Sequence, residues 1–125
     1  MAIKILIADD DEQITEALSR LLKDYKVLVA RDGKSALDSA VSWKPDLILL
    51  DIAMPVMNGI EVLEKLTAMP RKPLVIMLTG DESVKTVSKA MAIGVFSYIT
   101  KPFDAELVLD QVRKVAEFLG KSSAV

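Results

Sequence analysis

Acidic side chains directly follow two short apolar segments of the chain. Asp9 and Asp10 come after the segment from Ile3 to Ala8, and Asp51 comes after the segment from Leu47 to Leu50. Clustered carboxylates repel one another and raise one another's pKa values unless a cation lies among them. The chain has no Cys and no His, so the ligands of such a cation would be oxygen atoms. Oxygen ligands favour Mg²⁺, with Mn²⁺ as an alternative, and the pattern therefore predicts a metal site.

Two further apolar segments are followed by groups that suit a phosphate. Thr79 comes after Leu74 to Leu78, and Lys101 comes shortly after Phe96 to Ile99. The threonine hydroxyl can donate a hydrogen bond to a phosphate oxygen, and the lysine ammonium offers a compact positive charge. Taken singly, Thr79 could be an ordinary strand-end hydroxyl and Lys101 an ordinary surface lysine. Together with the acidic residues, they indicate phosphoryl chemistry.

These residues would meet only if the segments before them were strands of one parallel sheet. Short apolar runs alternate with longer stretches of helical periodicity, which is typical of a doubly wound α/β fold. The expected strands are Ile3 to Ala8, Val27 to Ala30, Leu47 to Leu50, Leu74 to Leu78 and Phe96 to Ile99. The carboxyl ends of parallel strands lie at one edge of the sheet, where ligands bind in such folds.

Apolar residues three or four positions apart predict a helix after each strand. The five stripes are Ile14, Leu18, Leu21 and Leu22; Leu37, Ala40 and Val41; Val62, Leu63 and Leu66; Val84, Val87 and Met91; and Val108, Val112, Val115 and Leu119. Asp11, Asp81 and Asp104 are the expected caps of the first, fourth and fifth helices. For Asp11 a capping role is a better interpretation than a metal ligand.

Composition limits the possible functions further. The 125 residues fit one domain, expected at residues 1–120, with a polar tail at 121–125. The net charge is −2 and no long run of Lys or Arg occurs, which argues against direct nucleic-acid binding. No apolar stretch approaches the roughly 20 residues of a membrane span. A soluble cytoplasmic protein is expected. Because the chain lacks His, it cannot form a phosphohistidine, so any phosphohistidine that donates a phosphoryl group must lie on another molecule.

Three segments resemble the motifs of the receiver domains of bacterial two-component response regulators. The segment from Ile5 to Glu12 resembles the acidic first loop, Lys44 to Gly59 resembles the phosphorylation-site stretch, and Tyr98 to Phe103 resembles the lysine motif. The three occur in the family's order and spacing. The resemblance covers nearly the whole chain and implies a flavodoxin-like sheet with strand order 2-1-3-4-5, as in chemotaxis regulators.

The resemblance also implies roles for individual residues. Asp51 would be the nucleophile that accepts a phosphoryl group from a histidine kinase, a histidine phosphotransfer protein or a small phosphodonor. Asp10 and Asp51 would bind Mg²⁺ directly, Asp9 would act largely through water, and the backbone carbonyl of Ala53 would add a ligand. Lys101 would pair with the phosphoryl group.

Further implications concern switching and partners. Thr79 and Tyr98 would form the switch, and Pro102 would follow a cis peptide bond. The kinase would contact the first helix and the loop after the fifth strand, at Ile14, Ala17 and Phe103. An unknown output partner, or a second copy in a phosphorylation-dependent dimer, would contact the fourth helix, fifth strand and fifth helix, at Lys85, Lys89, Met91 and Tyr98. A core position explains Met91 about as well.

Two alternatives share the fold but not the function. A degenerate receiver would act only as a protein-binding module, but such a chain usually lacks the acceptor or the lysine, and both are present. A Mg²⁺-dependent phosphohydrolase of the haloacid-dehalogenase type needs a second acid two residues after its nucleophile, where this chain has Ala53. A signalling phosphoacceptor is therefore expected rather than a turnover enzyme.

Overall fold

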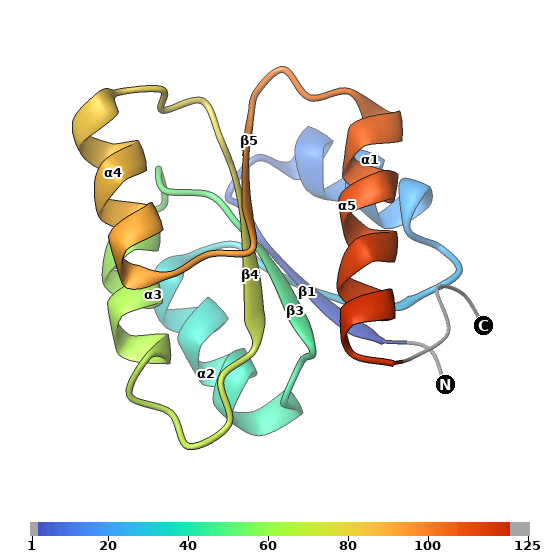
Figure 1. The fold of residues 1–125 in the computed structure, drawn as a ribbon, viewed down its shortest axis with the longest axis horizontal. Coiled ribbons are helices and arrows are strands. Elements are labelled where there is room, and N and C mark those ends of the chain that lie inside the picture. The colour runs from blue at the N-terminus through green and yellow to red at the C-terminus, as the bar shows by residue number, and fades with distance from the viewer. Residues whose placement is uncertain (1–2, 121–125) are drawn as a thin grey trace.

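Strands and helices alternate strictly through residues 3–120, the part of the chain that the computed structural model describes (Figure 1). The elements are β1 (Lys4–Ala8), α1 (Glu12–Leu21), β2 (Lys26–Ala30), α2 (Gly33–Trp43), β3 (Leu47–Leu50), α3 (Gly59–Leu66), β4 (Leu74–Thr79), α4 (Val84–Ile93), β5 (Ser97–Thr100) and α5 (Ala105–Phe118). Each strand begins and ends within one residue of its predicted bounds. The tail expected at residues 121–125 lies outside the described residues.

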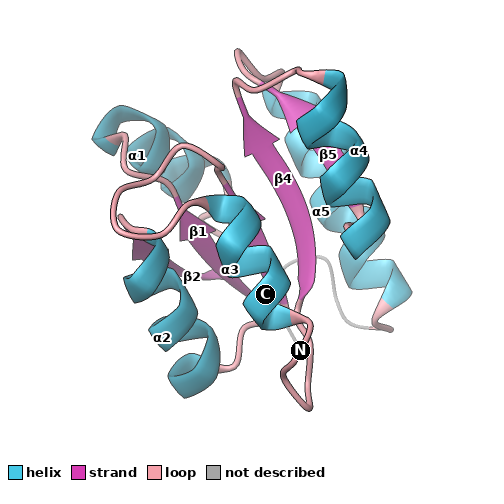
Figure 2. Cartoon of the chain, turned by 90° about the vertical axis from the view of Figure 1, so that its left-hand side faces the viewer, coloured by secondary structure: helices cyan, strands magenta, loops and turns pink. Residues whose placement is uncertain are grey.

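The five strands form one parallel sheet in the order β2-β1-β3-β4-β5 (Figure 2). In this register Ala8 pairs with Leu50, and Thr79 pairs with Thr100. The strands therefore end nearly level with one another, and the residues that follow them meet at one edge. This topology confirms the predicted doubly wound α/β fold and its strand order.

Helices cover both faces of the sheet. Figure 1 shows α1 and α5 on one side and α2, α3 and α4 on the other. Successive side chains of a strand point to opposite faces, so β1 contributes Ile5 and Ile7 to one core and Leu6 to the other. The central strands β1 and β3 are buried on both faces, which explains why they read as continuous apolar runs.

Two of the three predicted caps are in place. The Asp11 carboxylate accepts the N–H of Gln13 at 2.9 Å, and that of Asp104 accepts the N–H of Glu106 at 2.8 Å. The prediction that Asp81 caps α4 is wrong, because Ser83 is the capping residue. Asp81 instead accepts the N–H of Ser83 at 2.9 Å, a local turn that delays the start of the helix.

The apolar stripes are correct for α1 and α5 but only partly so for α2 and α4. In α5, Val108, Val112 and Val115 are fully buried. In α4, by contrast, Val84 is 82% exposed and Met91 is 54% exposed, while Ala90 is buried. The small Ala90 is the residue of α4 that packs into the core, and the larger Val84 and Met91 lie on the solvent side. The interpretation of Met91 as a core residue is therefore wrong, and Val41 of α2 is exposed for the same reason.

Among the described residues, none of the helices combines the length and hydropathy that crossing a membrane requires.

Because Ile76 is buried and Val84 is exposed, truncation of the two side chains should change the free energy of unfolding by different amounts. Ile76 in the middle of β4 is fully buried, so Ile76→Ala is expected to lower the free energy of unfolding by about 3 kcal/mol. The exposed Val84→Ala is expected to change it by no more than about 0.5 kcal/mol. Urea denaturation of both variants measures the difference. Similar losses at the two positions would contradict the packing described for α4.

Candidate functional site

The carboxyl ends of β1 and β3 hold two buried carboxylates side by side. The Asp51 N–H donates to the Ala8 carbonyl at 2.9 Å, and the Asp9 N–H donates to the Ala30 carbonyl at 3.1 Å. These bonds extend the sheet by one residue and fix where both side chains begin. Asp9 is 3% exposed and Asp51 is 5% exposed.

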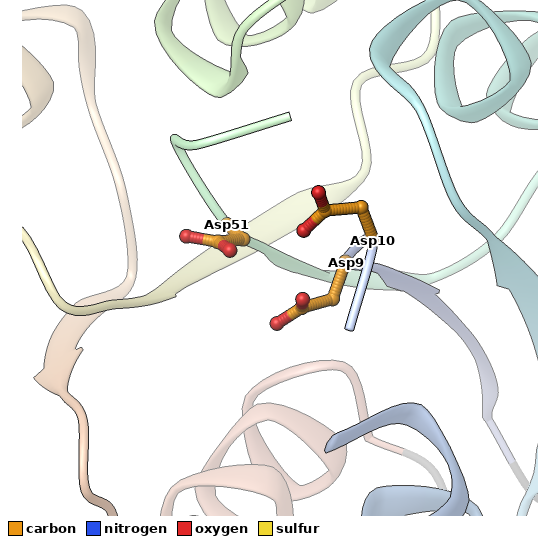
Figure 3. A group of neighbouring side chains, drawn as sticks. All are labelled: Asp9, Asp10 and Asp51. Carbon is orange, nitrogen blue, oxygen red and sulfur yellow. The ribbon is translucent and has the colours of Figure 1, made fainter. Parts of the chain in front are cut away.

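Asp10 joins these two residues in an acidic cluster. Each of Asp9, Asp10 and Asp51 offers a carboxylate oxygen, and these oxygens lie within 4.8 Å of one another (Figure 3). Asp10 is exposed, so the cluster has two buried members and one that opens to solvent. Three oxygen ligands at this spacing fit a hard divalent cation such as Mg²⁺, which keeps several of its waters.

Lys101 reaches the acidic cluster from the end of β5. Its Nζ donates to Asp9 Oδ2 at 2.6 Å and to Asp51 Oδ2 at 3.1 Å. The Lys101 backbone N–H donates to the Thr79 carbonyl at 2.9 Å, which ties the lysine to the end of β4. The peptide bond between Lys101 and Pro102 is cis. One ammonium thus neutralises part of the charge of two buried acids.

Burial and the contact between Asp9 and Lys101 both shift the pKa values of these two residues. Removal from water raises the pKa of Asp9, and the hydrogen bonds from Lys101 and from the Asp11 N–H offset that effect only in part. Burial lowers the pKa of Lys101, but its hydrogen bond to Asp9 and the charge of Asp51 outweigh burial and raise it overall. Three carboxylates share one ammonium here, so the site carries excess negative charge, which favours binding a cation.

Thr79 and Tyr98 lie beside the site on β4 and β5. Thr79 is buried, and its Oγ1 accepts the N–H of Asp81 at 3.4 Å. The Tyr98 hydroxyl donates to the carbonyl of the same Asp81 at 2.6 Å. Burial raises the pKa of Tyr98, and the charges of Asp81 and Asp51 add to that effect. The backbone of Asp81 thus links Thr79 to Tyr98. The sequence could not predict this role, because the side chain of Asp81 takes no part in it.

The loop from Asp51 to Asn58 borders the acidic cluster. Ala53 is exposed, and its N–H donates to Asp51 Oδ1 at 3.4 Å. Val56 has a φ of 71°, in the left-handed region that a β-branched residue rarely adopts. Its side chain is 79% exposed, so burial does not compensate for this strain.

A glycine holds the end of this loop against the residues that follow β3. A Cβ added to Gly59 would overlap the Asp51 carbonyl oxygen and lie 2.8 Å from Ile52 Cα. The Gly59 N–H also donates to the Ile52 carbonyl at 2.9 Å. The close approach explains why residue 59 is a glycine.

The structure thus gathers five of the predicted site residues directly. Lys101 contacts Asp9 and Asp51, Asp10 completes the acidic cluster, and Ala53 contacts Asp51. Thr79 and Tyr98 are both hydrogen-bonded to the backbone of Asp81. For the predicted kinase-binding surface, Ala17 is exposed, while Ile14 and Phe103 are half-buried.

Comparisons with known proteins agree with this geometry. A family model described as "Response regulator receiver domain" matches residues 5–113. The chain belongs to this family and is a receiver domain of a two-component response regulator.

Relatives with different outputs match the chain. Response regulator MprA of Mycolicibacterium vanbaalenii is 36% identical over 115 residues, which cover 90% of this chain and 50% of the relative. A protein-glutamate methylesterase/protein-glutamine glutaminase of Desulfotalea psychrophila is 44% identical over 107 residues, covering 80% of this chain and 29% of the relative. The chain spans half the length or less of these two relatives.

Solved structures of receivers superpose closely. The chemotaxis protein CheY4 of Vibrio cholerae has a TM-score of 0.82 at 31% identity, covering 92% of this chain and 99% of that one. The receiver domain of Francisella response regulator 1452 has a TM-score of 0.87 at 28% identity, covering 94% and 98%.

The charge balance of the site can be tested by removing the lysine. Lys101→Met leaves Asp9 and Asp51 buried without their cation, so at pH 7 with a chelator it is expected to lower the free energy of unfolding by about 3 kcal/mol. Lys114→Met is the control: Lys114 pairs with Asp110 at 3.3 Å on the exposed side of α5, and its loss should cost no more than about 0.5 kcal/mol. Equal effects in denaturant titrations would show that Lys101 does not balance the buried acids.

The strain at Val56 can be tested by replacing it with glycine. Val56→Gly is expected to raise the free energy of unfolding by about 1 kcal/mol, because glycine adopts a positive φ without a Cβ clash. Val41→Gly is the matched control, because Val41 is also exposed but lies within α2; there glycine should be destabilising by about 0.5 kcal/mol or more. A loss of stability in both variants would rule out strain at residue 56.

Proposed function

We propose that Asp51 is the phosphoacceptor of this receiver domain and that the acidic cluster binds Mg²⁺ during phosphoryl transfer. The observation that carries the proposal is the contact of Lys101 with both buried acids, Asp9 and Asp51, at the edge of the cluster. Asp9 and Asp51 are both buried and both contact the lysine, but Asp51 directly follows β3, the middle strand of the five, and lies in the segment that resembles the family's phosphorylation-site stretch.

The proposed reaction needs no acid-base histidine on this chain. A carboxylate oxygen of Asp51 attacks the phosphorus of a phosphohistidine on the donor protein. The new O–P bond forms as the N–P bond breaks, and the donor imidazole leaves and takes up a proton. Positioning and neutralisation of charge supply most of the catalysis in such transfers.

Each residue of the site has a proposed part in this transfer. Asp10 and Asp51 would bind Mg²⁺ directly, Asp9 would act through water, and Ala53 would add its carbonyl oxygen. The bound ion would supply positive charge for the phosphoryl oxygens. Lys101 would move its hydrogen bonds from the acids to the phosphoryl group, which compensates for the charge that the group adds.

Thr79 and Tyr98 are the proposed switch. Thr79 ends the strand next to Asp51, so its hydroxyl can turn from the Asp81 N–H towards a phosphoryl oxygen. The contact of the Tyr98 hydroxyl with the Asp81 carbonyl couples the same loop to β5. A change at Thr79 would thereby alter the surface of α4, β5 and α5. An output partner or a second copy would bind there, while a histidine kinase or phosphotransfer protein would contact α1 and the loop after β5.

Lys101 and Ala53 favour a phosphoacceptor over the two alternatives, a protein-binding module and a phosphohydrolase. A protein-binding module without phosphorylation would not need Lys101 held between two buried acids. A phosphohydrolase would need an acid at residue 53, and the alanine there offers none. We therefore propose a phosphoacceptor that undergoes one transfer per signal rather than an enzyme with a separate substrate.

Intact mass spectrometry after incubation with acetyl phosphate and Mg²⁺ tests the proposal. We predict one phosphoryl adduct in the unmodified chain, none in Asp51→Asn, and none when a chelator removes the metal. Asp110→Asn is the matched control, because Asp110 is an exposed acid on α5, and it is expected to accept phosphate as the unmodified chain does. An adduct that persists in Asp51→Asn would contradict the assignment. Turnover of many phosphoesters without an adduct would favour the hydrolase.

A further inference from the structure

The first residue of α2 touches the loop that follows the acceptor strand. Gly33 is buried, and its N–H donates to the Pro55 carbonyl at 3.3 Å. A Cβ added at Gly33 would overlap the Met57 carbonyl oxygen and lie 2.6 Å from the Met57 carbonyl carbon and 2.7 Å from Met57 Cβ. The contact is with backbone, which cannot move aside as a flexible side chain would. Residue 33 therefore has no room for any side chain while the loop keeps this path.

The contact lies at the strained part of the loop. Pro55 and Met57 are the two neighbours of Val56, and the Met57 N–H donates back to the Pro55 carbonyl at 2.8 Å. The exposed Val56 side chain does not hold the positive φ in place, so the backbone contacts on either side must do so. Gly33 provides such a contact from a separate element of the fold.

The strained residue Val56 is three positions from Ala53, and the other end of the same loop is fixed at Gly59. Because the Gly59 N–H donates to the Ile52 carbonyl, both ends of the loop are tied. With the loop held at Gly59, we expect a displacement at Met57 to act on the part of the loop that leads back to Ala53 and Asp51. The path of the loop is therefore set by α2 as well as by the strand that carries the acceptor.

We propose that Gly33 is a positioning residue for the acidic site: the close approach of α2 to Pro55 and Met57 holds the loop in its strained path and so fixes the Ala53 backbone beside Asp51. This inference rests on the proposed function, because Gly33 would position the Mg²⁺ ligands proposed above. Gly33 itself touches neither the metal nor the phosphoryl group. It acts only through the loop.

Calorimetric titration with Mg²⁺ tests this role directly. Gly33→Ala pushes on the Met57 carbonyl, and we expect the affinity for Mg²⁺ to fall by about tenfold, as it does when groups that orient metal ligands are altered. The rate of phosphorylation by acetyl phosphate at low Mg²⁺ should fall in parallel and recover at saturating Mg²⁺. The control is Lys34→Ala, the next residue of the same helical turn, whose exposed side chain points away from this contact to pair with Asp38 at 3.1 Å.

A second variant separates positioning from a general loss of stability. Val56→Gly frees the loop between Pro55 and Met57, so adding Gly33→Ala in that background should lower the Mg²⁺ affinity by much less than in the unmodified chain. If Gly33→Ala alone does not fold, recovery of a folded, Mg²⁺-binding protein by Val56→Gly supports the proposal, and no recovery contradicts it. A destabilised Gly33→Ala with unchanged Mg²⁺ affinity also overturns it. Failure of the unmodified chain to bind Mg²⁺ would instead overturn the proposed function.

Discussion

Two carboxylates buried side by side are the constraint on which the rest of this structure depends. Asp9 and Asp51 end neighbouring central strands, and the sheet gives them no freedom to separate. Their mutual repulsion has to be balanced by positive charge, and Lys101 supplies one part of it from a third strand. The balance is incomplete, because Asp10 adds a third carboxylate to the two that Lys101 contacts. A bound cation and a phosphoryl group would each change this balance, which makes the site sensitive to both.

Backbone hydrogen bonds link the charged residues of the site to more distant parts of the fold. Lys101 is bonded through its backbone to the end of β4, and β4 leads into Asp81, which contacts Tyr98 on β5. On the other side, the loop after Asp51 is held by Gly33 of α2 and by the start of α3. A change in charge at Asp51 would therefore act on backbone segments that belong to several elements. This arrangement suits a domain whose output depends on a change of surface.

Much of the fold could be predicted from the sequence because the strands are short, apolar and buried on both faces. The meeting of Asp9, Asp10, Asp51 and Lys101 followed from one rule, that parallel strands end at one edge of the sheet. Helical periodicity was less reliable in α4, where it could not show that small Ala90 rather than Val84 faces the sheet. The contact of Gly33 with the Met57 carbonyl depends on the path of a loop, which side-chain types do not encode.

Locating the acyl phosphate in the chain distinguishes Asp51 from the two acids beside it. Borohydride reduces an aspartyl phosphate to homoserine, and sequencing of peptides by tandem mass spectrometry then identifies the residue. Asp51 directly follows β3, the middle strand of the five, and lies in the segment that resembles the family's phosphorylation-site stretch, so we predict homoserine at residue 51 alone. Homoserine at residue 9 or 10, or at none of the three, would contradict it.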